Sequence, residues 1–141
     1  MTARANDEPF QFLGRSDVPF PSEPSASTLE TFANRYPQRH YTIRFQAPDF
    51  TSLCPVTGQP DFAKIEISYI AGDLCLESKS LKFYLSAFRN TRSFNEEIVN
   101  RMLDDLIAAC QPRQMTVRGE FAPRGGISLT VEASHPKPAA I

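Results

Sequence analysis

The sequence lacks the residues on which common metal and nucleotide motifs are built. It contains only two histidines, His40 and His135, near opposite ends of the globular region, and no Cys/His spacing typical of a zinc site. It also lacks a P-loop, a GxGxxG turn and the sequence marks of a Ser/His/Asp hydrolase. We therefore expect no bound metal, no Rossmann unit and no serine hydrolase chemistry.

Cysteine content and charge exclude further classes. The three cysteines are an odd number without a CxxC pair, which favours free thiols over a disulfide framework. Fifteen Lys and Arg balance sixteen Asp and Glu, so any anionic ligand must be met by local charges. No apolar run approaches the ~20 residues of a membrane span, and no basic-then-apolar signal region opens the sequence. We expect a soluble, cytoplasmic protein that binds neither nucleic acid nor membrane.

The length and proline distribution predict one domain with an extended arm. A chain of 141 residues, 41% hydrophobic, suits a single compact core. Residues 1–39 hold five of the twelve prolines and predict a proline-rich N-terminal arm, whose isolated aromatics suggest that part of it packs on the domain or on a neighbouring subunit. Residues 40–134 predict the single domain, and residues 135–141 a flexible C-terminal tail.

Hydrophobic periodicity predicts the elements of that domain. Alternation predicts strands at 41–45, 64–70, 115–121 and 127–131, and the turn at 71–73 predicts a hairpin returning residues 74–77 against 64–70. Helical spacing predicts helices at 81–88 and 94–107, the second capped by Ser93 with Glu96 and stopped by Pro112. This order predicts an α+β fold, an antiparallel sheet with two consecutive helices on one face. Its open edges favour oligomerisation.

Two groups of residues suit chemistry. Cys54 and Asp61 share an ordered loop between strands, where a thiol nucleophile and a proton donor could meet. A buried small cysteine and a turn aspartate explain the same residues. Lys79 and Lys82 at a strand-to-helix junction, with Arg124 in a Pro-Arg-Gly-Gly tip, suit phosphate groups, although a solvated helix face and turn chemistry also explain them.

Four segments together resemble a known enzyme family. They read SLCPVTGQPDFA, ESKSLKFY, SFNEEIVNR and FAPRGGI, and they resemble the NADPH-dependent 7-cyano-7-deazaguanine reductases of QueF type in their short, single-module form. The resemblance runs from about residue 45 to 131. It implies a tunnelling fold (T-fold), in which subunits join their sheets into a barrel, often as a homo-oligomeric decamer. It also implies NADPH as cofactor and 7-cyano-7-deazaguanine as the small-molecule substrate.

The resemblance also implies a role for individual residues. Cys54 matches the nucleophile that adds to the nitrile carbon as a thioimide, and Asp61 matches the acid that protonates the nitrogen. Glu96 matches the carboxylate that recognises the deazaguanine edge, although its place three residues after Ser93 also fits a helix cap. Leu76, Glu77 and Ser78 match the strand that binds the base. Lys79, Lys82 and Arg124 match the positions that hold the NADPH phosphates.

One departure from the family pattern concerns substrate binding and protons. The family reads Phe-His-Glu where this chain has Phe94-Asn95-Glu96, and asparagine can hydrogen-bond but cannot carry a proton near neutral pH. The leading expectation is reduction of the nitrile to the aminomethyl base in queuosine biosynthesis for tRNA. The alternatives are an amidine-forming relative and a nitrile-binding protein with impaired reduction because of Asn95.

Overall fold

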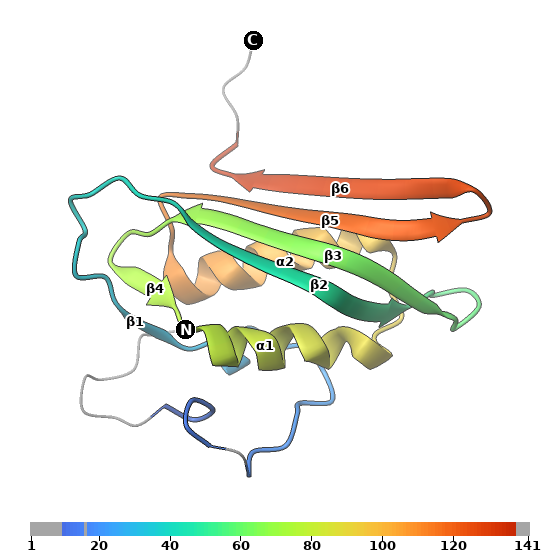
Figure 1. Ribbon diagram of the computed structural model, residues 1–141, viewed down its shortest axis with the longest axis horizontal. Coiled ribbons are helices and arrows are strands. Elements are labelled where there is room, and N and C mark those ends of the chain that lie inside the picture. Colours follow the sequence, from blue (N-terminus) through green and yellow to red (C-terminus); the bar gives the residue numbers. More distant parts are fainter. Residues whose placement is uncertain (1–9, 16, 138–141) are drawn as a thin grey trace.

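The computed structural model describes residues 10–15 and 17–137, so the outer parts of the expected arm and tail, 1–9 and 138–141, lie outside the described residues. Four antiparallel strands form the main sheet in the order β2-β3-β5-β6 (Figure 1). Their bounds are Ile43–Leu53 for β2, Pro60–Ile70 for β3, Gln114–Arg124 for β5 and Ile127–His135 for β6. The two long hairpins confirm the strands predicted at 64–70, 115–121 and 127–131, and all three extend beyond those bounds. The strand predicted at 41–45 is confirmed from Ile43 on and continues to Leu53.

Both α-helices cover one face of this sheet (Figure 1). Helix α1 spans Ser78–Ser86 and continues into a short 3₁₀ helix at Ala87–Asn90, and α2 spans Asn95–Cys110. The core lies between the layers, because the strands alternate apolar side chains toward the helices. Its largest fully buried members include Tyr69, Tyr84, Phe88, Ile65, Met102 and Leu106. The α+β architecture is therefore the one expected.

The expected hairpin between residues 64–70 and 74–77 is wrong. Strand β4, Leu74–Leu76, pairs antiparallel with β1, Thr31–Ala33, in a separate two-stranded sheet. Strand β3 already pairs with β2 on one edge and with β5 on the other, so it has no free edge for a third neighbour. Residues 31–33, which belong to the expected arm, therefore supply a strand next to the start of α1.

The start of α2 also differs from the expected capping box. Its N-cap is Phe94, which makes no side-chain cap bond. The Ser93 hydroxyl instead donates to the Glu97 carboxylate at 3.0 Å, which leaves the Glu96 side chain exposed. The expected end is confirmed, because α2 stops at Cys110 and Gln111 takes the left-handed conformation before Pro112.

The part of the arm between Phe12 and Pro21 packs against α1 and the 3₁₀ helix that follows it. Phe12 and Phe20 each place a ring 4.5 Å from the ring of Phe83. Lys79 donates from Nζ to the Arg15 carbonyl at 2.6 Å, and Arg89 donates to the Pro21 carbonyl at 2.8 Å. Aromatic contacts and charge-assisted hydrogen bonds therefore hold this segment to its own subunit.

Candidate functional site

The loop between β2 and β3 presents Cys54 in a closed turn. The Cys54 amide donates to the Gln59 carbonyl at 2.8 Å, and the Gly58 amide donates to the Cys54 carbonyl at 3.0 Å. Gly58 has φ +72°, a left-handed conformation that glycine adopts without the steric cost of a side chain. The turn thus leaves a partly exposed thiol at the end of β2.

The turn also activates this thiol. A side-chain hydrogen bond from Thr57 and then the backbone N–H groups of Thr57 and Val56 lower the pKa of Cys54 to about 7. Desolvation opposes them, and the charge of Arg124 has the smallest effect. A thiolate is the nucleophilic form of cysteine, so a large share of Cys54 is reactive at neutral pH. By contrast, burial raises the pKa of Cys110 to about 12, which keeps that thiol protonated.

We expect the reactivity of Cys54 to titrate near neutral pH. Its pKa is lowered, so the thiolate fraction grows as the pH rises and levels off above the pKa of about 7. The rate of alkylation by iodoacetamide, followed by peptide mass spectrometry at Cys54, should therefore rise tenfold per pH unit below the midpoint and reach a plateau by about pH 8. A midpoint at the ordinary cysteine value would contradict this activation.

Asp61 and Arg124 form an ion pair beside the same turn. Arg124 Nε lies 2.6 Å from Asp61 Oδ1, and its Nη2 donates to the Pro60 carbonyl at 2.7 Å. Asp61 is 8% exposed, and it lies opposite Ser52 in the β2·β3 register. Because Arg124 also acts on the Cys54 thiol, the structure brings together three expected site residues, from the β2–β3 loop, β3 and β5.

The start of α2 lies against this loop. Leu53 donates its amide to the Thr91 carbonyl at 2.9 Å and accepts from the Ser93 amide at 3.2 Å. These bonds hold the segment before α2 against the end of β2, so α2 begins, with Asn95 and Glu96 in its first turn, at the end of the sheet where the β2–β3 loop and the β5–β6 turn also lie (Figure 1). Asn95 Oδ1 is buried and accepts no hydrogen bond within the described chain. A free buried acceptor suits a ligand N–H.

Glu77 has a structural task that its place in the motif did not reveal. It is 4% exposed and is the N-cap of α1, with one carboxylate oxygen accepting from the Lys79 amide at 2.7 Å and the other from the Ser80 amide at 2.8 Å. Its own amide donates to the Glu30 carbonyl. Each carboxylate oxygen therefore accepts one hydrogen bond from the helix start and keeps a second acceptor site, so capping and contact with a base are compatible.

We expect Glu77→Ala to destabilise the fold. Loss of a helix N-cap costs about 0.5–2 kcal/mol, and this cap is buried with two short bonds, so we expect about 2 kcal/mol. Urea unfolding followed by circular dichroism measures the loss, with Glu132→Ala on the exposed face of β6 as the control. An unchanged free energy of unfolding together with lost base binding would instead assign Glu77 to the substrate.

The remaining expected residues line two cavities beside α1. Lys82 lines one of about 470 Å³ between α1 and β2, with Ser78, Arg89 and apolar side chains that include Phe50 and Leu81. Leu76, Glu77 and Ser78 line a second, of about 600 Å³, with Phe45 and the exposed Arg35 among its other residues. Lys79 differs from Lys82 because its ammonium group already binds the Arg15 carbonyl.

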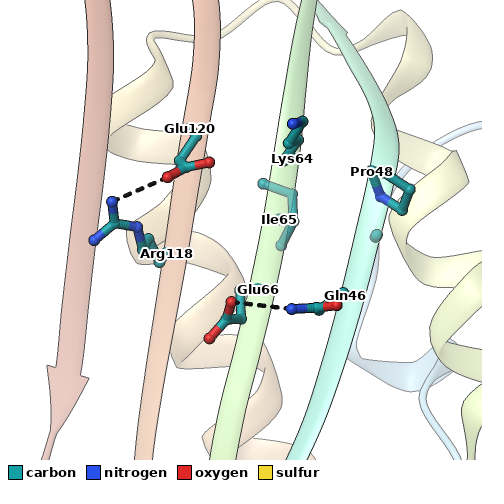
Figure 2. Close-up of a pocket in the computed structure, with 8 residues that line it drawn as sticks. Gln46, Pro48, Lys64, Ile65, Glu66, Arg118 and Glu120 are labelled. Atoms are coloured by element: carbon teal, nitrogen blue, oxygen red, sulfur yellow. Dashed lines mark hydrogen bonds and ion pairs between the residues drawn. The ribbon is translucent and has the colours of Figure 1, made fainter.

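A further cavity carries none of the expected site residues. It measures about 490 Å³ and lies over β2, β3 and β5 (Figure 2). Three of its charged side chains form ion pairs, Arg118 with Glu120 at 3.0 Å and Glu66 with Arg44 at 3.2 Å, and Gln46 donates to Glu66 at 3.5 Å. These internal pairs offer no activated group to a substrate.

Sequence reasoning missed Thr57 and Arg92. Thr57 is the first cause of the lowered Cys54 pKa, and its hydroxyl also accepts from the Gln59 amide at 3.2 Å. The guanidinium of Arg92 lies over Gly58, as described below. The Thr-Gly pair three residues after Cys54 is a turn signal that could have indicated Thr57. Arg92 had no sequence signal, because its contact depends on the pairing of two distant segments.

The fold and the site define a class of protein, an α+β tunnelling-fold protein with an activated thiol beside a carboxylate–guanidinium pair. A family model described as QueF-like protein matches residues 60–140. Together with the relatives described next, this match shows that the chain belongs to the QueF-like protein family.

Relatives named NADPH-dependent 7-cyano-7-deazaguanine reductase cover most of the chain. One from Magnetococcus marinus is 51% identical over 115 residues, which are 82% of this chain and 90% of the relative. One from Streptococcus thermophilus is 48% identical over 126 residues, 89% of this chain and 77% of the relative. The crystal structure of the archaeosine synthase QueF-Like in the apo form superposes with a TM-score of 0.65 at 20% identity, covering 70% of this chain and 96% of that one, which shows the shared fold.

Proposed function

We propose that this chain is an NADPH-dependent nitrile reductase that converts 7-cyano-7-deazaguanine to 7-aminomethyl-7-deazaguanine. The observation that carries the proposal is the Cys54 thiol, whose pKa of about 7 and closeness to the Asp61–Arg124 pair suit addition to an electrophilic carbon. The relatives at 48–51% identity supply the substrate and the reductant. The product belongs to queuosine biosynthesis, in which the free base rather than tRNA is the ligand.

Cys54 and Asp61 divide the first step between them. The Cys54 sulfur forms a C–S bond to the nitrile carbon as the C≡N bond becomes C=N, and the Asp61 carboxylate takes the thiol proton and gives it to the nitrogen, which yields a thioimide. Arg124 orients the Asp61 carboxyl through the 2.6 Å contact. Because the structure engages Arg124 in this way, we assign it to Asp61 ahead of a cofactor phosphate.

We place the proposed cofactor in the cavity between α1 and β2. Its apolar wall and the Lys82 ammonium group suit a dinucleotide, whose ring system needs apolar contacts and whose phosphates need positive charge. Arg89 also lines this cavity, with its guanidinium bonded to the Pro21 and Ser86 carbonyls. NADPH supplies two hydrides when bound, one to the thioimide carbon and one to the imine carbon. Between the two hydride transfers Cys54 would leave as thiolate, and one proton in addition to the one that Asp61 gave would complete the neutral amine. Lys79 would join the phosphate contacts on leaving the Arg15 carbonyl.

We propose a homo-oligomer, with the decamer of the family as the expected state, in the cytoplasm. The outer edges of β2 and β6 pair with no strand among the described residues, and such edges suit sheet joining between copies. All three cysteines are free, as a reducing compartment favours. No helix of the described chain is long and apolar enough to span a membrane. Light scattering on purified protein would measure the subunit number.

The function is tested by the stoichiometry of NADPH oxidation against amine product. We expect two NADPH consumed per aminomethyl base formed. Covalent capture without NADPH oxidation would favour a nitrile-binding protein, and an amidine formed from ammonia without NADPH would favour the amidine-forming alternative. Either result would overturn the reductase.

Asn95 is the residue that favours the alternative of a nitrile-binding protein. Its buried Oδ1 accepts no hydrogen bond in the described residues, so we propose that it accepts an N–H of the base. Asn95→Ala in a Cys54→Ala background should weaken noncovalent binding of the base about tenfold, as calorimetry would show. Unchanged affinity would remove Asn95 from the binding site.

A further inference from the structure

The loop that carries Cys54 contacts the segment before α2 through main-chain hydrogen bonds and through the side chain of Arg92. The backbone bonds of Leu53 to Thr91 and Ser93 form a parallel bridge in which Leu53 lies opposite Arg92. Leu53 directly precedes Cys54, so Arg92 is held beside the loop by the main chain. Its side chain then determines what the loop packs against.

The guanidinium of Arg92 occupies the space over Gly58. A methyl group added to Gly58 would overlap Arg92 Nη2 and lie 3.0 Å from Arg92 Cζ. Glycine at this position therefore permits a close approach of the guanidinium to the backbone of the turn. Arg92 is exposed, and no hydrogen bond or ion pair joins its side chain to another described residue, so its contact with the turn is one of packing.

We infer that Arg92 is a positioning residue, whose guanidinium holds the 54–59 loop in the conformation that activates the Cys54 thiol. The inference deepens the proposed function, because it concerns the same reacting thiol. Arg92 is absent from the roles that family resemblance implies.

The activating groups explain why loop position matters. Thr57 accepts from the Gln59 amide and bonds the Cys54 sulfur, so the three residues keep their arrangement only while the turn stays closed. The other charged groups around the loop are the Asp61–Arg124 pair from β3 and β5, and the exposed Glu96 at the start of α2. Opening of the turn would move the sulfur away from Thr57 and the backbone donors while these charges stay on their own elements.

The test is the pH dependence of Cys54 alkylation in Arg92→Ala, measured without nitrile and without NADPH. We expect the midpoint to move toward the ordinary cysteine value, which lowers the alkylation rate at pH 7 by about tenfold. Arg118→Ala, an exposed arginine over the other face of the sheet, should leave the profile unchanged. An unchanged profile in Arg92→Ala would overturn the inference while leaving the proposed reductase activity intact.

A second comparison separates packing from charge. Arg92→Met keeps much of the side-chain volume and removes the cation, so a held loop predicts a smaller effect than in Arg92→Ala. If the charge of Arg92 acts directly on the thiol, Arg92→Met should shift the alkylation profile at least as much as Arg92→Ala does. That result would overturn the positioning role.

A double-mutant cycle tests the contact itself. Gly58→Ala should slow alkylation in the wild-type background, because its methyl group displaces the guanidinium from the turn and because alanine is strained at the positive φ. In the Arg92→Ala background the same substitution should cause a smaller fold-change, since only the strain of the positive φ remains. Equal fold-changes in both backgrounds would show that Arg92 does not hold the loop through Gly58.

Discussion

Cys54→Ala will abolish covalent capture of the nitrile and lower kcat/KM by at least about three orders of magnitude. The reason is that the other two thiols, Cys75 and Cys110, are buried, and burial raises the pKa of Cys110 to about 12. Neither can replace an exposed thiol whose pKa is about 7. Steady-state NADPH oxidation and intact mass after incubation with the nitrile measure the two effects.

The matched control for this prediction is Cys75→Ala. Cys75 lies in β4, and its thiol is within 3.8 Å of the Tyr41 hydroxyl rather than near the β2–β3 loop. We expect its kcat/KM to stay within about threefold of the wild type. Substantial turnover in Cys54→Ala would remove Cys54 from the chemistry and with it the thioimide.

Asp61→Asn is expected to cause the second largest loss, about 10²- to 10⁴-fold in kcat, because asparagine has no acidic proton to give to the nitrile nitrogen. The change keeps the size of the side chain and an oxygen that can accept from Arg124. The pair is half-exposed on the arginine side, so its loss should cost at most about 1 kcal/mol of stability. Single-turnover thioimide formation measures the first step directly.

The control for Asp61→Asn is Asp73→Asn in the exposed turn before β4, which should leave kcat unchanged. Thioimide formation at the wild-type rate in Asp61→Asn would move the proton donor to another group. In that case Arg124 would lose its proposed task of orienting an acid.

The sequence predicted those parts of the fold that depend on local pattern. Alternating runs such as residues 64–70 marked strands, because one face of each strand is buried under the helices. The stop of α2 near Pro112 was also predictable, since proline cannot continue a helix. The pairing of β4 with β1 was not predictable, because it depends on which edges of β3 are already occupied.

In the site, too, local pattern predicted some features, and the pairing of distant segments determined the others. Thiol and carboxylate could be proposed from the spacing of Cys54 and Asp61 and from the family motif. Their link through Arg124 depends on the β5–β6 turn lying over the β2–β3 loop, which no local pattern contains. Likewise, the sequence placed Lys79 near a helix start, but its bond to the Arg15 carbonyl depends on how the arm folds back.

The central claim is that Cys54 captures the nitrile and that NADPH discharges the adduct as amine. The most direct measurement is intact mass under native conditions after incubation with 7-cyano-7-deazaguanine, before and after NADPH is added. We predict an adduct with the mass of the base, absent from Cys54→Ala and discharged by NADPH. Folded protein that binds the base but forms no adduct would contradict the account, and an adduct that persists with NADPH would contradict the reductase.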